Sequence, residues 1–89
     1  MNAETVLITG ASSGIGLALA RCFAADGCRL VLVARKGDAL EALATELRKA
    51  HKIQAQVITA DLARPEAPIR LLAHLQAAGL KVDVLVNNA

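Results

Sequence analysis

The sequence predicts an α/β fold in which a parallel sheet is covered by helices on both faces. Four short runs rich in β-branched residues recur about every 25 residues, and a helical pattern lies between each pair of runs. The runs are almost continuously apolar, as expected for strands that are buried on both faces. Strands that alternate with helices of 10–15 residues form right-handed crossovers, so we expect a doubly wound, three-layer sheet with the element order βαβαβαβ.

The predicted strands and helices follow from this pattern in chain order. The strands are expected at Thr5–Thr9, Arg29–Val33, Gln56–Ala60 and Val82–Val86. The first helix is expected from Gly14 to about Asp26, with Ile15, Leu19, Cys22 and Phe23 on its apolar face and Gly27 after its end. The second helix is expected to begin near Asp38, a plausible N-cap, and to bury Leu40, Leu43 and Leu47. Its end carries cations that suit the negative end of the helix dipole: Arg48, Lys49, His51 and Lys52. The third opens near Pro65 or a few residues later, carries Ile69, Leu72 and Leu75, and ends at Gly79.

Length and composition limit the classes of function. With 89 residues, 55% hydrophobic and 20% charged, the chain forms at most one small globular domain. A net charge of +2 gives no argument for nucleic-acid binding. Neither a membrane span nor a signal peptide is apparent, so a cytoplasmic protein is expected. Cys22 and Cys28 have no histidine near them in the sequence and are expected to be buried free thiols, not metal ligands.

A glycine-rich segment after the first strand carries the strongest functional signal. Gly10, Gly14 and Gly16 are spaced G-x-x-x-G-x-G between a strand and a helix. Gly10 permits a sharp turn, Gly14 lets a ligand approach the backbone, and Gly16 lets the helix pack closely. The free N–H groups of a helix start favour an anion, so this segment predicts a pyrophosphate site. Ser12 and Ser13 carry hydroxyls that can donate to phosphate oxygens.

The end of the second strand distinguishes between two nicotinamide cofactors. An NAD site usually has a carboxylate about 20 residues after the glycines, where it binds the ribose 2′-hydroxyl. Here Ala34 stands at that position, and Arg35 and Lys36 follow it. A guanidinium suits a 2′-phosphate, so we predict NADP rather than NAD. The alternative is that both cations are solvated turn residues.

The ends of the other two strands also carry polar residues. Asp61 could accept a hydrogen bond from an adenine amino group, or it could be a turn aspartate. Asn87 and Asn88 follow the fourth strand and either tie the chain back to the sheet or occupy an ordinary turn. His51 and His74 are expected on the surfaces of helices, far from these strand ends, without a catalytic role.

Together these motifs resemble the short-chain dehydrogenase/reductase superfamily over the whole chain. The run from Thr9 to Gly16 matches T-G-x-x-x-G-I-G, Asp61-Leu62 matches D-[LV], and Asn87-Asn88-Ala89 matches the start of N-N-A-G. The resemblance implies a Rossmann-type fold with strand order 3-2-1-4. It also implies a cofactor site that includes the following residues: Gly10, Ser12, Ser13, Gly14, Ile15, Gly16, Arg35, Asp61, Leu62, Asn87 and Ala89. Within that set Asn87 would brace the sheet and Ala89 would border the cofactor ribose. One departure is Ser13, which is neutral where some NADP-dependent members carry a second basic residue.

The resemblance further implies a larger oxidoreductase than these 89 residues. Family catalysis uses a Ser and a Tyr-x-x-x-Lys set, and this sequence contains no tyrosine. We therefore expect the N-terminal cofactor-binding part of one Rossmann domain, with no catalytic residue and little turnover of its own.

The complete protein is expected to form a homo-oligomer and to pass hydride between NADP(H) and a small carbonyl or alcohol substrate. The alternatives are a non-catalytic NADP-binding sensor or scaffold, or an inactive fragment. A P-loop NTPase is disfavoured because no Gly-Lys-Ser/Thr follows the glycines. The isolated chain is expected to be prone to aggregation, because its fourth strand forms an open edge.

Overall fold

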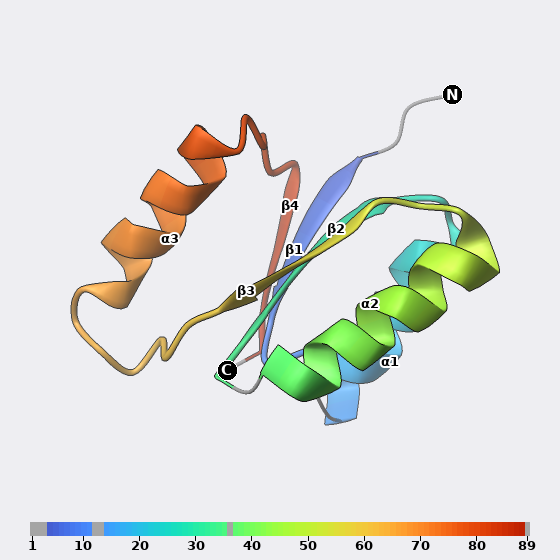
Figure 1. Cartoon of the computed structure of the whole chain (residues 1–89), viewed down its shortest axis with the longest axis horizontal. Coiled ribbons are helices and arrows are strands. Elements are labelled where there is room, and N and C mark those ends of the chain that lie inside the picture. The colour runs from blue at the N-terminus through green and yellow to red at the C-terminus, as the bar shows by residue number, and fades with distance from the viewer. Residues whose placement is uncertain (1–3, 12–13, 36, 89) are drawn as a thin grey trace.

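The computed structural model shows a four-stranded parallel sheet between two layers of helices (Figure 1). It describes residues 4–11, 14–35 and 37–88. The strands are β1 (Thr5–Thr9), β2 (Arg29–Ala34), β3 (Ala55–Thr59) and β4 (Val84–Asn87), and the helices are α1 (Gly14–Ala25), α2 (Gly37–His51) and α3 (Ala67–Ala77). Helices α1 and α2 cover one face and α3 lies on the other, so the three-layer prediction is confirmed.

The strands are arranged in the order β3-β2-β1-β4, as predicted. In the register, Thr9 at the end of β1 lies beside Val33 of β2 and Asn87 of β4, and Ala34 lies beside Thr59 of β3. All strands are parallel, so their carboxyl ends lie at one edge of the sheet. That edge carries each polar or glycine-rich segment that the sequence singled out.

The core is divided by the sheet into two clusters. The larger lies under α1 and α2 and includes Val6, Ile8, Leu30 and Leu32, which are fully or almost fully buried. The smaller lies on the α3 side and is built from five buried residues: Leu7, Val31, Val33, Ile58 and Leu75. Alternate residues of β1 and β2 point to opposite clusters, which explains why these strands are apolar throughout.

The predicted apolar face of α1 is confirmed for Leu19 and Phe23 and wrong for Ile15 and Cys22. Ile15 is 70% exposed and Cys22 is exposed, whereas the buried residues of the helix are Gly16, Ala20 and Ala24. Leu19 and Phe23 are only partly buried at the border of the cluster. A stripe of small side chains lets the helix axis lie close to the sheet, and larger side chains on that stripe would hold it away.

The expectation of two buried thiols fails for Cys22, which is exposed. Cys28 is half-buried, and desolvation by burial, together with the charges of Glu4 and Asp26, raises the pKa of its thiol.

Helix α2 follows the prediction closely, whereas α3 does so only at Leu75. In α2 the expected leucines are buried together with Ala44, but Asp38 lies within the first turn rather than before it. In α3 the buried residues are Ala67 and Leu75, and Leu71 is partly buried. Ile69 and Leu72, which were expected on the buried face of this helix, are exposed. Hydrogen bonds from the N–H groups of Gly79 and Leu80 to α3 carbonyls close its end, and Gly79 takes a positive φ of 69°.

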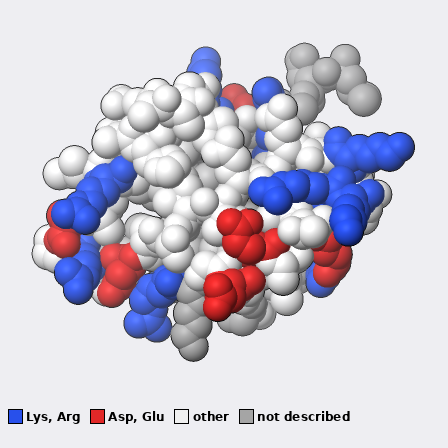
Figure 2. Space-filling view, viewed as in Figure 1, with Lys and Arg blue, Asp and Glu red and all other residues white. Residues whose placement is uncertain are grey.

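Strand β4 and α3 leave apolar surface uncovered. Leu85 is 64% exposed, Leu72 is 55% exposed and Ile69 is 74% exposed. An apolar groove of about 540 Å³ lies between α3 and the β1–β4 pair and is lined by Leu72, Leu75 and Leu85 among others. Figure 2 shows a broad area without charged side chains over α3 and the segment before β4, whereas charges of both signs gather over α2. Among the residues that the structure describes, no helix is long and apolar enough to cross a membrane.

This uncovered surface predicts that the isolated 89-residue chain self-associates. Exposed leucines beside an open strand edge favour pairing with a second chain. Sedimentation velocity should show an average mass that rises with protein concentration, and Leu85→Lys should return the chain toward a monomer. Ala42→Lys adds the same charge to an exposed position of α2 and should leave the association unchanged. A chain that stays monomeric at every concentration would contradict this prediction.

Candidate cofactor site

The site is built around the Gly10 peptide at the end of β1. Gly10 adopts a φ of +65°, and its N–H donates to the Val33 carbonyl of β2 at 2.8 Å. Its carbonyl oxygen accepts from Asn88 Nδ2, after β4, at 3.4 Å. A left-handed backbone is easy only for glycine, so the sharp turn predicted at Gly10 is present. The turn directs the chain away from the sheet toward α1.

Gly16 brings α1 onto this turn. A Cβ at position 16 would lie 2.4 Å from the Gly10 carbonyl oxygen and 2.7 Å from Asn88 Nδ2. Neither distance leaves room for a methyl group, so the helix can lie this close only with glycine at that position. The predicted close packing through Gly16 is thus observed, and it is made against the backbone of the turn.

Gly14 has a different environment. It is the first residue of α1 and has a φ of +59°, yet no atom of the other described residues, its chain neighbours and its own helix backbone aside, lies within 4 Å of the place where a Cβ would be. The first turn of α1 carries no acidic side chain, and Ile15 beside it is exposed. The first turn of α1 thus offers backbone N–H groups without an acidic side chain beside them. Ser12, Ser13 and Ala89, which the sequence placed in the same site, lie outside the described residues.

Thr9 joins the turn to the segment after β4. Its buried hydroxyl accepts the backbone N–H of Asn88 at 2.9 Å and donates toward Asn87 Oδ1 at 3.2 Å, with the Val86 carbonyl oxygen at 3.4 Å. Asn87 and Asn88 therefore tie the end of β4 to β1, which is the first of the two alternatives raised by the sequence. Thr9 is a functional residue that the motifs alone do not reveal, although a polar residue that ends an apolar strand immediately before glycine is a usable signal.

Arg35 follows β2 at the same edge. It is exposed, and it forms no ion pair with any residue in the described part of the chain. Ala34 stands before it and is partly buried against the larger core cluster. Ala34 supplies no carboxylate at the position where an NAD site would have one. Lys36, the second predicted cation, lies outside the described residues.

Asp61 and Leu62 lie after β3 but face different spaces. Asp61 Oδ1 accepts the N–H of Ala63 at 3.1 Å, and its carbonyl accepts that of Arg64 at 3.0 Å. It is thus a turn aspartate, and only one carboxylate oxygen is used in this turn. Leu62 packs against the smaller core cluster and lines the groove under α3.

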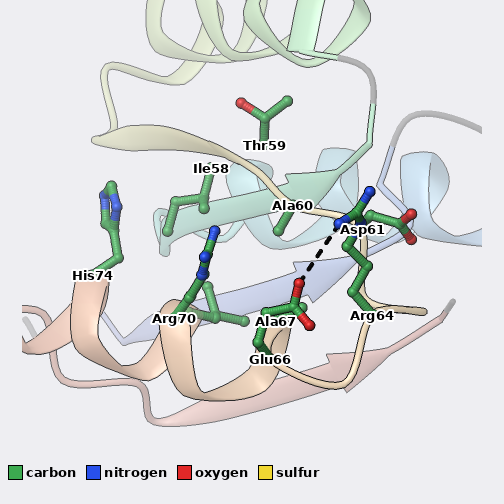
Figure 3. Close-up of a pocket in the computed structure, with 10 residues that line it drawn as sticks. Ile58, Thr59, Ala60, Asp61, Arg64, Glu66, Ala67, Arg70 and His74 are labelled. Carbon is green, nitrogen blue, oxygen red and sulfur yellow. Dashed lines mark ion pairs between the residues drawn. The ribbon is translucent and has the colours of Figure 1, made fainter.

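A second cleft, of about 330 Å³, lies between β3 and α3 (Figure 3). Asp61 lines one end of it and His74 the other, and Arg70 projects between them. Arg64 at its rim pairs with Glu66 at 3.7 Å. Within the described ranges, no three His, Cys, Asp or Glu side chains are grouped closely enough to hold a metal ion.

Comparison with known proteins identifies the family. The family model for short chain dehydrogenases matches residues 4–89. Serine 3-dehydrogenase of Agrobacterium fabrum is 41% identical over 85 residues, which is 96% of this chain and 32% of that enzyme. Human very-long-chain 3-oxoacyl-CoA reductase is 32% identical over 96% of the chain and 27% of its own length. The chain thus spans about a third of the length of the curated relatives it matches.

Solved structures agree on the fold. L-Sorbose reductase from Gluconobacter frateurii, in complex with NADPH and L-sorbose, superposes with a TM-score of 0.91 and 37% identity, over all of this chain and 34% of that one. A short-chain dehydrogenase from Sphingobium yanoikuyae in complex with NADPH gives a TM-score of 0.87 and 44% identity over 97% of this chain and 34% of that one.

Two glycine substitutions should distinguish the cost in stability of a packing clash from the cost of backbone strain. Gly16→Ala places a methyl group against a backbone oxygen that cannot move independently, so we expect the free energy of unfolding to fall by about 3 kcal/mol or more. Gly14→Ala meets no atom and suffers only left-handed strain, about 1–2 kcal/mol. Urea unfolding of both variants measures the difference. An equal or smaller loss for Gly16→Ala would show that α1 does not depend on this close approach.

The Thr9 hydroxyl should contribute measurably to stability. In Thr9→Val the Asn88 N–H loses its acceptor, and we expect the free energy of unfolding to fall by about 1–3 kcal/mol. Thr9→Ser keeps the hydroxyl and loses one methyl group, at a cost of about 0.8 kcal/mol. If the valine variant were as stable as the serine variant in urea, the hydrogen bonds of Thr9 would not hold β4 to β1.

Proposed function

Because the chain belongs to the short chain dehydrogenases, we propose that it forms the cofactor-binding part of an NADP(H)-dependent oxidoreductase. The complete protein would transfer hydride between the nicotinamide and a carbonyl or alcohol carbon of a small substrate. The observation that carries this proposal is the open start of α1, held beside the Gly10 turn by Gly16. The proposal covers binding by these residues, since the sequence contains no tyrosine to move a proton in the family's manner.

The start of α1 fits the pyrophosphate that both nicotinamide cofactors share. Gly14 leaves space where a side chain would otherwise stand, and no acidic residue of the first turn opposes an anion. Free N–H groups at a helix start carry about half a positive charge, which favours phosphate oxygens. In this proposal Gly10 and Gly16 shape the turn, while Gly14, Ile15, Ser12 and Ser13 surround the phosphates.

Arg35 supports the choice of NADP. An exposed guanidinium that pairs with none of the described carboxylates can donate two parallel hydrogen bonds to a phosphate. An NAD site needs a carboxylate near this position, and Ala34 supplies none. The sorbose reductase and the Sphingobium enzyme were both solved with NADPH, which agrees with this choice. NAD is therefore the less favoured cofactor.

The remaining proposed contacts lie at the ends of β3 and β4. The Asp61 carboxylate is half-buried beside the sheet edge and, with Oδ1 used in its turn, has Oδ2 to offer to an adenine amino group. Leu62 and Asn87 hold this edge through packing and through the hydrogen bond to Thr9. We propose Ala89 as the residue that borders the ribose. The bound nicotinamide would supply or accept the hydride, and these residues would orient it.

Arg35→Ala in the complete protein tests the cofactor choice. Removing a charged hydrogen-bond donor should weaken NADPH binding by about 1.5–3 kcal/mol and leave NADH binding almost unchanged. Isothermal titration with each cofactor measures both affinities. Lys81→Ala removes one positive charge before β4, at the opposite edge of the sheet, and should affect neither cofactor. Equal losses for NADPH and NADH in Arg35→Ala would show that Arg35 does not bind the 2′-phosphate.

A further inference from the structure

The cleft between β3 and α3 has an apolar floor that belongs to the core. It has a volume of about 330 Å³ and lies on the face of the sheet that α3 covers, opposite α1 and α2. Ile58 and Ala67, which line it, are buried, and Leu71 is partly buried against the smaller core cluster. A volume of this size lies near the lower end of the range for small-molecule sites, roughly 300–1,000 Å³. Core packing therefore holds the floor of the cleft in place.

Arg70 brings a positive charge to this floor. Figure 3 shows its side chain projecting from α3 into the cleft. It forms neither an ion pair nor a side-chain hydrogen bond with any residue that the structure describes. A guanidinium can donate two parallel hydrogen bonds to a carboxylate or a phosphate. Arg70 thus offers a free two-point donor beside an apolar surface.

His74 supplies a second donor on the same side of the cleft. It lies four residues after Arg70, about one helical turn further along α3, and lines the same cleft. Side chains at this spacing share one face of a helix, with their Cβ atoms roughly 5–6 Å apart. Both side chains point from α3 toward β3 (Figure 3). An imidazole N–H and a guanidinium can therefore reach the same anion.

The acidic side chains of the cleft do not oppose an anion at this position. Among the described residues that line it, the carboxylates are Asp61 and Glu66. Glu66 pairs with Arg64 at 3.7 Å, so these two charges offset each other. Asp61 lies at the end of the cleft opposite His74, and one of its carboxylate oxygens is used in its own turn. The part of the cleft between Arg70 and His74 is thus its cationic part.

We propose that this cleft binds a small organic anion, with its carboxylate or phosphate on Arg70 and His74 and its apolar part on Ile58 and Leu71. The site is separate from the glycine turn and Arg35, so the inference goes beyond the proposed function. Exposed charges alone hold an ion weakly, and an apolar floor alone does not distinguish between hydrocarbons. The combination favours a ligand that carries both an anionic group and an apolar body. The volume of about 330 Å³ suits a ligand with one ring.

Four probes test the proposal in the complete protein, with NADPH present in excess to occupy the proposed cofactor site. Phenyl phosphate and benzoate carry a ring with an anionic group, and the tighter of the two shows whether phosphate or carboxylate is preferred. Inorganic phosphate has the charge without the ring, and benzyl alcohol has the ring without the charge. Ligand-observed NMR titrations measure the dissociation constants. Both partial probes should bind at least about 10-fold more weakly than the better complete probe.

Substitutions on α3 assign the binding to this cleft. Arg70→Gln removes the charge and keeps a polar side chain, and it should weaken the better probe about 10-fold or more. His74→Gln should weaken it about threefold, because one neutral donor is worth less than a charged pair of donors. Lys49→Gln is the matched control. It removes a cation from an exposed position of α2, on the other face of the sheet, and should change the affinity less than about twofold.

Arg35→Ala distinguishes this site from the proposed cofactor site. The affinity for the better probe should be the same in Arg35→Ala as in the original protein. A loss in Arg35→Ala without a loss in Arg70→Gln would assign the anion to the cofactor site and overturn the proposal. The proposal is also overturned if neither complete probe binds, or if inorganic phosphate binds as tightly as phenyl phosphate. Failure of the NADP assignment is detected separately, as equal effects of Arg35→Ala on NADPH and NADH.

Discussion

The Gly10 peptide is the point at which the carboxyl edge of the sheet is assembled. Its N–H reaches β2 through Val33, its carbonyl reaches the segment after β4 through Asn88, and Gly16 of α1 lies directly over that carbonyl. The end of β1 and the start of α1 therefore meet two distant segments, β2 and the residues after β4, at one peptide. Two of these contacts, those with Val33 and Gly16, are made between backbone atoms on both sides, so the arrangement tolerates little displacement. The start of α1 is therefore held in a fixed relation to three strands.

Two different constraints require glycine at this point. Position 10 needs a left-handed φ, which other residues adopt only with strain, while position 16 needs the absence of a side chain. Gly14 combines a left-handed φ with space that no other described side chain fills. The glycine spacing in the sequence thus has three separate physical causes: the turn at Gly10, the close packing at Gly16 and the left-handed backbone at Gly14.

The sequence predicted the order of the elements, the strand order and the edge at which the site lies, because hydrophobic periodicity and glycine spacing are local signals. It failed for the buried face of α1, since Gly16, Ala20 and Ala24 weigh little in a hydrophobic pattern although they are the residues that let the helix approach the sheet. It failed similarly for α3, where Ile69 and Leu72 have no described partner to cover them. The role of Thr9 depends on residues at the end of another strand, β4. Such contacts between distant segments cannot be inferred from the local sequence.

The geometry also explains how affinity and selectivity for the cofactor are separable in the proposed site. The pyrophosphate is common to both nicotinamide cofactors, so backbone N–H groups at α1 can supply affinity but cannot distinguish the two. In the proposed site, discrimination comes from the end of β2, where Arg35 is exposed. The first element depends on φ angles and close backbone packing, whereas the second depends on one exposed side chain. Substitutions at the second can therefore change cofactor preference without disturbing the turn on which the fold depends.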